Sequence, residues 1–170
     1  MKQAKPYYDV KNSKKRICVL QGGTRSGKTY SIILALIEFS YKNKGKNLYV
    51  TIARKTFPAL RGTAMRDFFE ILRDNQVYSS EFHNKSNNEY FLNGNRFEFI
   101  SLDQPQKIRG RKRDLLFINE ANELNFEDWQ QLIFRTSEKI ILDFNPSEEF
   151  HWIYDKVLTR EDVEFHQTTY

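Results

Sequence analysis

Eight consecutive residues near the N-terminal end of the chain have the types and spacing of a phosphate-binding loop. They are Gly22, Gly23, Thr24, Arg25, Ser26, Gly27, Lys28 and Thr29. Glycines tolerate the backbone dihedral angles that point successive amide groups at one anion, and they allow a phosphate to approach closely. The lysine would contact the β- and γ-phosphates of a nucleoside triphosphate, while the threonine hydroxyl would bind Mg²⁺. The segment therefore predicts a nucleotide site.

A second candidate group follows the apolar run LLFI, where Asn119 and Glu120 stand next to each other. In ATPases with a phosphate loop this strand usually ends in Asp-Glu. The first acid supports Mg²⁺ through its bound waters, and the second polarises the attacking water. Glu120 fits the second role. Asn119 keeps an acceptor oxygen at the metal position but lacks the charge, so we expect Mg²⁺ to be held mainly by Thr29, the phosphates and water.

Other polar residues could assist hydrolysis. Asn145 follows the apolar run KIILDF, where its side chain could sense the γ-phosphate, although Asn-Pro is also a common turn. Arg25 lies within the loop and Arg109 precedes the LLFI run. Either arginine could neutralise charge on the transferred phosphoryl group, in its own chain or in a neighbouring one. Contact with a DNA backbone, or solvation, explains each arginine equally well. Arg54 and Lys55 could contact DNA or nucleotide, but they are more simply interpreted as charges that flank a helix.

The pattern of apolar runs predicts strands that alternate with helices. The expected strands cover 17–21, 48–53, 115–118, 139–144 and 163–168, and the expected helices cover 27–42, a segment opened by Pro58, a segment capped by Asn125, and 150–158. A β-hairpin with Asn93-Gly94 at its turn lies between them. This order predicts a three-layer α/β domain over 17–170, a P-loop NTPase of the RecA-like (ASCE) class with a mainly parallel central sheet and an inserted β-hairpin. Residues 1–16 are expected to form an N-terminal arm.

The composition is that of a basic globular chain. The 170 residues are 39% hydrophobic and carry a net charge of +5. Basic residues concentrate at 11–16 and 107–113, which suits contact with nucleic acid or phosphate as well as a solvated loop. The single cysteine, Cys18, cannot form a disulfide within these residues. The longest apolar run, 31–37, is too short for a membrane span, and no signal peptide is recognisable, so we expect an intracellular protein without a membrane partner.

Four segments taken in order resemble the large terminase subunit of tailed bacteriophages. They are GGTRSGKT, YVTIARKTFPALRGT, KIRGRKRDLLFINEANEL and ILDFNP, within 17–146. The resemblance implies an ATPase motor domain that drives double-stranded DNA into a procapsid in the cytoplasm of the infected bacterial host. It implies a portal protein and a small terminase subunit as partners, and a homo-oligomeric ring on assembly, with a monomer in isolation also compatible.

The resemblance also assigns roles to individual residues. It implies that Gly22, Gly27, Lys28 and Thr29 bind ATP with Mg²⁺. Glu120 would be the catalytic carboxylate, Asn145 would belong to the coupling motif, and Arg109 would be the arginine finger given to a neighbouring subunit. Asn119 departs from the acid that is usual in the family. The sequence ends at Tyr170, leaving no room for the family's C-terminal nuclease domain, so we do not expect DNA cleavage.

Three other functions remain open from the sequence. A helicase-like, nucleic-acid-dependent ATPase is weakened because the segment NEAN lacks the acid or histidine that helicases have after this motif. A small-molecule kinase would need an arginine-bearing lid over an acceptor pocket. A nucleotide-binding module that docks on DNA or capsid without turnover would use the nucleotide only structurally. The guanine-recognising tetrapeptide Asn-Lys-x-Asp is absent from the sequence, which disfavours a GTPase.

Overall fold

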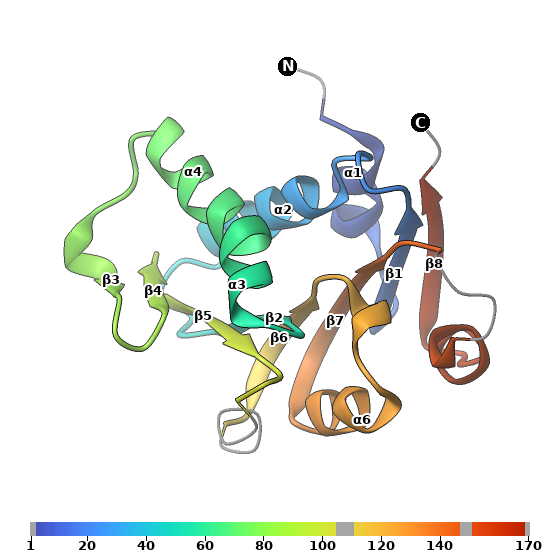
Figure 1. Ribbon diagram of the computed structural model, residues 1–170. Helices are drawn as coiled ribbons and strands as arrows, with labels where there is room; N and C mark the ends of the chain where they lie inside the picture. The colour runs from blue at the N-terminus through green and yellow to red at the C-terminus, as the bar shows by residue number, and fades with distance from the viewer. Residues whose placement is uncertain (1–2, 105–110, 147–150, 169–170) are drawn as a thin grey trace.

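The computed structural model describes residues 3–104, 111–146 and 151–168. Within these residues one eight-stranded sheet has the order β3-β4-β5-β2-β6-β7-β1-β8 (Figure 1). The strands are β1 (Ile17–Gly22), β2 (Tyr49–Arg54), β3 (His83–Asn84), β4 (Glu89–Leu92), β5 (Asn95–Ser101), β6 (Arg113–Ile118), β7 (Thr136–Phe144) and β8 (Val163–Thr168). The α-helices are α1 (Lys5–Asn12), α2 (Lys28–Lys42), α3 (Phe57–Leu60), α4 (Arg66–Asp74) and α6 (Phe126–Phe134). Shorter turns are π-helical at η1 (Arg61–Met65) and η4 (Ile153–Val157), and 3-10 helical at η2 (Ser80–Phe82) and η3 (Ala121–Glu123).

The sheet is mainly parallel, as the sequence predicts. β5, β2, β6, β7, β1 and β8 pair in parallel in that order, whereas β3 and β4 pair antiparallel, as do β4 and β5. Because parallel strands end at the same edge of a sheet, the segments that follow β1, β6 and β7 meet there. The phosphate-loop segment, Asn119-Glu120 and Asn145 are these segments, so the topology brings distant parts of the sequence to one edge.

Helices cover both faces of the sheet, which explains why its strands read as continuous apolar runs. Side chains alternate along β1: Cys18 and Leu20 pack against the layer that holds α1, α2 and α4, while Ile17 and Val19 pack against the layer that holds α6 and η4. The two helical layers lie on opposite sides of the sheet in Figure 1. This is the expected three-layer arrangement.

The predicted hairpin is present, but its second strand belongs to the central sheet. Asn93 and Gly94 form its turn with φ angles of 55° and 78°, the left-handed values that a tight hairpin turn needs. β5 then pairs antiparallel with β4 on one side and parallel with β2 on the other. The inserted hairpin therefore extends the edge of the central sheet.

The N-terminal segment differs from the expected arm. Residues 5–12 form α1, which has a proline in its first turn and packs on α2 through Tyr7 and Val10, 5% and 9% exposed. The Tyr7 hydroxyl donates to Glu38 on α2, and Lys11 Nζ lies 3.1 Å from Glu38 Oε1. These contacts join two segments that are far apart in the sequence, so local periodicity alone did not indicate the helix.

The remaining expected elements agree in kind and differ at their ends. The helix expected from Pro58 begins at Phe57, and the Asn125 cap closes a reciprocal capping box with Asp128. The helix expected over 150–158 is a π-helical turn at Ile153–Val157 in the part that the structure describes, and its expected first residue lies outside the described residues. No helix among the described residues is long and apolar enough to cross a bilayer.

Candidate active site

The loop between β1 and α2 has the backbone that its glycines predict. Gly27 precedes the first residue of α2 with a φ of 70°, a left-handed value that side chains rarely adopt. A Cβ at Gly22 would lie 3.0 Å from both the Cβ and the carbonyl oxygen of Thr168 on β8. Glycine is therefore favoured at both positions, at Gly27 by backbone conformation and at Gly22 by close packing against Thr168.

Lys28 is folded back onto this loop. Its ammonium Nζ donates to the carbonyl oxygens of Gly22 and Gly23, at 2.7 and 2.9 Å, and to Ser26 Oγ at 3.0 Å. The residue is only 4% exposed. Burial lowers the pKa of Lys28, while two nearby carboxylates oppose that shift. A buried cation surrounded by backbone oxygens at the start of a helix marks the position where an anion would be stabilised.

Asp143, which the sequence analysis did not identify as a site residue, lies at the centre of the site. Asp143, the penultimate residue of β7, is fully buried. Its Oδ2 accepts a hydrogen bond from Thr29 Oγ1 at 3.1 Å, and its Oδ1 accepts one from the backbone N–H of Glu120 at 2.7 Å. Both oxygens lie 3.1 Å from Asn119 Nδ2. Burial raises the pKa of Asp143, whereas these donors and the Lys28 charge lower it.

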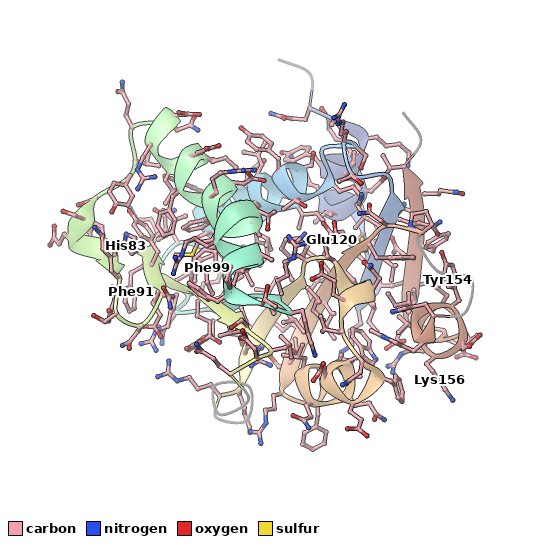
Figure 2. All side chains as sticks on the ribbon, viewed as in Figure 1. His83, Phe91, Phe99, Glu120, Tyr154 and Lys156 are labelled. Carbon is pink, nitrogen blue, oxygen red and sulfur yellow. The ribbon has the colours of Figure 1, made fainter. Side chains whose placement is uncertain are left out.

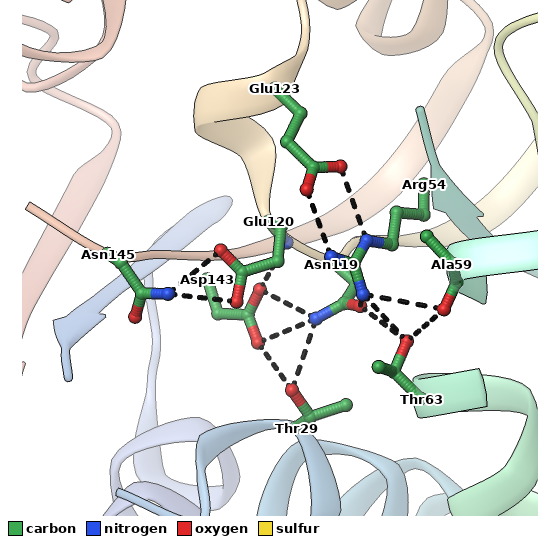
Figure 3. Close-up of polar contacts among 9 residues, drawn as sticks. All are labelled: Thr29, Arg54, Ala59, Thr63, Asn119, Glu120, Glu123, Asp143 and Asn145. Atoms are coloured by element: carbon green, nitrogen blue, oxygen red, sulfur yellow. Dashed lines mark hydrogen bonds and ion pairs between the residues drawn. The ribbon is translucent and has the colours of Figure 1, made fainter. Parts of the chain in front are cut away.

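Asn119 connects Asp143 to the far side of the site (Figure 3). Its Nδ2 donates to Asp143 and to Thr29 Oγ1, at 3.1 Å in each case. Its Oδ1 lies 3.3 Å from Arg54 Nη1 and 3.1 Å from Thr63 Oγ1. A carboxylate can only accept and a guanidinium can only donate, so the two neighbours fix which end of the amide faces which. Thr29 and Asn119, the two predicted metal residues, thus lie in contact.

Glu120 is held from two directions. Its backbone has a φ of 51°, a left-handed value that is uncommon for a residue with a side chain and is maintained here by the hydrogen bond from its N–H to Asp143. Its carboxylate oxygens accept from Asn145 Nδ2 at 3.2 and 3.1 Å. Asn145 Oδ1 in turn lies 3.3 Å from Lys28 Nζ. Burial, with the Asp143 charge second, raises the pKa of Glu120 to about 6.

Arg54, the last residue of β2, forms hydrogen bonds both with residues that follow β6 and with residues that follow β2. Its Nη2 and Nε donate to the two carboxylate oxygens of Glu123, at 2.9 and 3.2 Å. Its Nη1 lies 3.4 Å from the Ala59 carbonyl oxygen and 2.9 Å from Thr63 Oγ1, in addition to the contact with Asn119. Thr63 belongs to the π-helical turn η1. Such turns inside helices often occur at functional sites. Arg54 is thus a member of the site, and its interpretation as a flanking charge was incomplete.

Of the predicted site residues, five meet directly and two arginines do not join them. Lys28, Thr29, Asn119, Glu120 and Asn145 form one hydrogen-bonded network with Asp143. Arg25, like Thr24, is exposed at the tip of the loop. Arg109 lies outside the described residues. Figure 2 shows Glu120 well inside the outline of the molecule and Lys156 at its periphery.

The oxygen atoms of this network suit a magnesium ion that binds together with a nucleotide. The described residues contain no group of three or more His, Cys, Asp or Glu side chains that could hold a metal alone. The Thr29 hydroxyl and the Asp143 carboxylate are hard oxygen donors beside the loop that would hold phosphates. Mg²⁺ typically takes one or two such protein ligands and completes its shell with phosphates and water. The residues present therefore fit that ion.

Comparison with known proteins relates the chain to one family. The sequence profile of the phage terminase large subunit family matches residues 14–170. No curated protein sequence matches. The large terminase of a thermophilic bacteriophage superposes with a TM-score of 0.83 at 18% identity, over 98% of this chain and 46% of that one. That terminase has also been solved with ADP and with ATP-gamma-S.

Two further solved structures extend the fold match. The ATPase domain of the Thermus phage P74-26 large terminase gives a TM-score of 0.75 at 16% identity, over 98% of this chain and 80% of that one. The Phi-28 gp11 DNA packaging motor gives 0.66 at 16% identity, over 95% and 58%. At these identities the likeness establishes the fold, and the chain spans about half the length of the thermophilic phage protein. The family profile covers nearly all of the sequence, so the chain belongs to the phage terminase large subunit family and has its RecA-like P-loop fold.

Proposed function

We propose that this chain is an ATP-hydrolysing motor domain that couples hydrolysis to the movement of double-stranded DNA into a procapsid. The single observation that supports it is the network at one sheet edge, where Lys28, Thr29, Asp143, Glu120 and Asn145 come together from three different strand ends. Related terminases have been solved with ADP and ATP-gamma-S, and another relative is described as a DNA packaging motor.

The loop and α2 bind the phosphates in this proposal. The amides at the start of α2 and the Lys28 ammonium stabilise the negative charge of the triphosphate. The Thr29 hydroxyl would bind Mg²⁺, which neutralises charge on the phosphate oxygens when it is bound. These groups act mainly by positioning and electrostatics, because phosphoryl transfer leaves little covalent chemistry for the protein to perform.

Glu120 is the proposed base that orients and polarises the attacking water. With a pKa raised to about 6, its carboxylate is ionised at neutral pH yet more basic than an exposed glutamate. Asn145 holds both of its oxygens and also contacts Lys28. The same side chain therefore joins the phosphate-binding lysine to the catalytic acid, which is the connection that a coupling residue requires. Nucleotide phosphates compete with Asn145 for Lys28, so binding is transmitted to Glu120.

The remaining assignments follow from family membership. We propose Arg25 or Arg109 as the arginine that neutralises the transition state, with Arg109 acting on a neighbouring subunit of a ring. The portal protein and the small terminase subunit are proposed partners in the cytoplasm of the infected host. Arg25 is exposed at the loop, where it could also reach a ligand or an adjacent copy of the chain.

The test is ATP binding and steady-state hydrolysis, measured with and without DNA. We expect Glu120→Gln to abolish turnover while ATP binding is retained, and Glu127→Gln, an exposed glutamate on α6, to behave as wild type. Stimulation by duplex DNA supports the packaging motor, whereas preferential stimulation by single strands supports the helicase-like alternative. Turnover that survives in Glu120→Gln would remove the proposed base. Binding without turnover in the wild type, with DNA present, would favour the docking module.

A further inference from the structure

We propose that Asp143 on β7 is the carboxylate that supports Mg²⁺, and that Asn119, at the position where an acid is usual, is a positioning residue for it. This inference rests on the proposed function and assigns to β7 a role that β6 normally has. It replaces the expectation that the site relies on Thr29, phosphates and water without a protein carboxylate. Three features support it: the contacts of Asp143, the orientation of Asn119 and the charge balance between them.

The contact between Asp143 and Thr29 places a carboxylate next to the metal position. The Thr29 hydroxyl donates to Asp143 Oδ2 at 3.1 Å. A carboxylate that contacts the hydroxyl of a metal-binding threonine can also accept from waters bound to that metal, so it orients the ligands of the metal and raises its affinity. Asp143 lies opposite Leu20 of β1, two residues before the end of the strand that leads into the loop. β7 therefore presents this acid to the same site.

The orientation of Asn119 makes it unsuitable as the metal ligand. The atom that it turns towards Thr29 and Asp143 is the amide nitrogen, a donor that cannot bind a cation. Its oxygen faces the Arg54 guanidinium instead. Exchange of the two amide ends would place an oxygen against the Asp143 carboxylate and an N–H₂ group against the guanidinium, so both contacts would become repulsive. The neutral amide thus joins the Arg54 cation to the Asp143 carboxylate and holds that carboxylate beside Thr29.

Charge balance explains why an amide and not an acid occupies position 119. Asp143 is fully buried and accepts hydrogen bonds from three residues, Thr29, Asn119 and Glu120. A carboxylate at the 3.1 Å separation of Asn119 could not donate to Asp143 and would repel it, because two like charges at that distance in a buried site interact strongly. The asparagine instead donates to the Asp143 carboxylate and stabilises its charge. The contact between positions 119 and 143 therefore joins one buried acid to an amide donor, rather than two adjacent acids.

The experiment measures the Mg²⁺ requirement of ATP-gamma-S binding by calorimetry, which needs no turnover. Removal of a group that orients metal ligands typically weakens metal binding by about 10- to 100-fold. We expect Asp143→Asn to raise the Mg²⁺ concentration for half-maximal binding by that factor, while binding in EDTA is unchanged. Glu120→Gln removes a carboxylate from the same site and should leave the requirement unchanged. The exchange variant Asn119→Asp/Asp143→Asn returns the acid to the end of β6 and should restore most of the lost affinity.

A second variant keeps the inference testable if Asp143→Asn does not fold. Asn119→Asp should leave the Mg²⁺ concentration for half-maximal binding unchanged or increase it, because Asp143 already supplies the carboxylate. A lower Mg²⁺ concentration in Asn119→Asp, or an unchanged one in folded Asp143→Asn, would overturn the inference while leaving the proposed function intact. If the wild-type protein binds no ATP-gamma-S with or without Mg²⁺, the proposed function itself fails.

Discussion

Asn145 and Glu120 face each other across the ends of β7 and β6, and one amide nitrogen of Asn145 contacts both oxygens of the Glu120 carboxylate at 3.2 and 3.1 Å. The opposite end of the same amide contacts Lys28 at 3.3 Å. A single side chain therefore contacts both the lysine that we propose to bind phosphates and the proposed base. The relationship makes Asn145 a positioning residue, whose removal affects catalysis more than binding.

Asn145→Ala is expected to lower kcat while the KM for ATP changes little. Without the amide, the Glu120 carboxylate is no longer fixed in one rotamer, and loss of positioning by about 1 Å can cost on the order of 100-fold in rate. Steady-state kinetics over a range of ATP concentrations separates the two parameters. A variant that raises KM and leaves kcat unchanged would show that Asn145 contributes to binding instead.

Arg54→Ala is expected to destabilise the protein, because Arg54 donates to Glu123, Thr63 and Asn119 at once. Loss of a hydrogen-bonded partner that leaves polar groups unsatisfied costs about 1–3 kcal/mol. Urea unfolding monitored by circular dichroism gives the change in the free energy of unfolding. Lys46→Ala is the control, because Lys46 is exposed on the surface and its removal should change stability by less than about 0.5 kcal/mol. Equal effects of the two substitutions would contradict the expectation.

Gly22→Ala is expected to weaken the pairing of β1 with β8. The added methyl group would lie 3.0 Å from Thr168 backbone and side-chain atoms, so one strand must move. Forced overpacking of this kind costs about 1–3 kcal/mol. Gly62→Ala has nothing within 4 Å of the new Cβ and lies in a helical turn, so it should be neutral or stabilising. Thermal unfolding of both variants checks the difference, and a stable Gly22→Ala protein would refute the close-packing argument.

The attachment of α1 is expected to weaken in acid. Hydrogen bonds from Tyr7 and Lys11 hold the pKa of Glu38 at about 2, below its ordinary value of 4.5. A carboxyl group whose pKa is lower in the folded state contributes stability above its unfolded pKa and loses it as pH falls towards the folded value. The contribution of Glu38 should therefore be present at about pH 5 and above, and decline between pH 4.5 and about 2.

Hydrogen exchange of the α1 amides, compared between wild type and Glu38→Gln, measures this contribution. The protection of the α1 amides against hydrogen exchange in the wild type should fall towards that in Glu38→Gln as the pH decreases from 4.5 to about 2. Parallel curves for the two proteins would mean that Glu38 does not titrate with the attachment of α1. Because the side chain is 36% exposed, the effect should also decrease at high salt.

Local patterns were sufficient to predict the phosphate loop, the mainly parallel sheet and the capped helix α6. The strand ends were harder to predict because some strands begin with charged residues. β6 starts at Arg113, whose side chain is 1% exposed and donates to Thr51 Oγ1 and the Leu132 carbonyl oxygen. An apolar run cannot indicate a buried arginine, since its burial depends on partners on other elements.

The site roles of Asp143 and Arg54 also depend on partners that lie on other elements of the fold. Asp143 is the one charged residue between Ile140 and Phe144, the otherwise apolar second half of β7, and that anomaly is a signal that sequence reasoning could have used. Its partner Thr29 is 114 residues away, so only the order of the strands brings the two together. The roles of Arg25 and Arg109 in neutralising the transition state stay predictions.

The position of Lys28 has a consequence for how quickly and how tightly a ligand can be captured. Its ammonium bridges the carbonyl oxygens of Gly22 and Gly23 and the Ser26 hydroxyl, so the loop is already ordered around a cation. The conformational entropy of the loop is lost during folding and not at the moment of binding, which is the thermodynamic meaning of preorganisation. In the proposed complex the nucleotide phosphates would replace these oxygens as partners of the Lys28 ammonium.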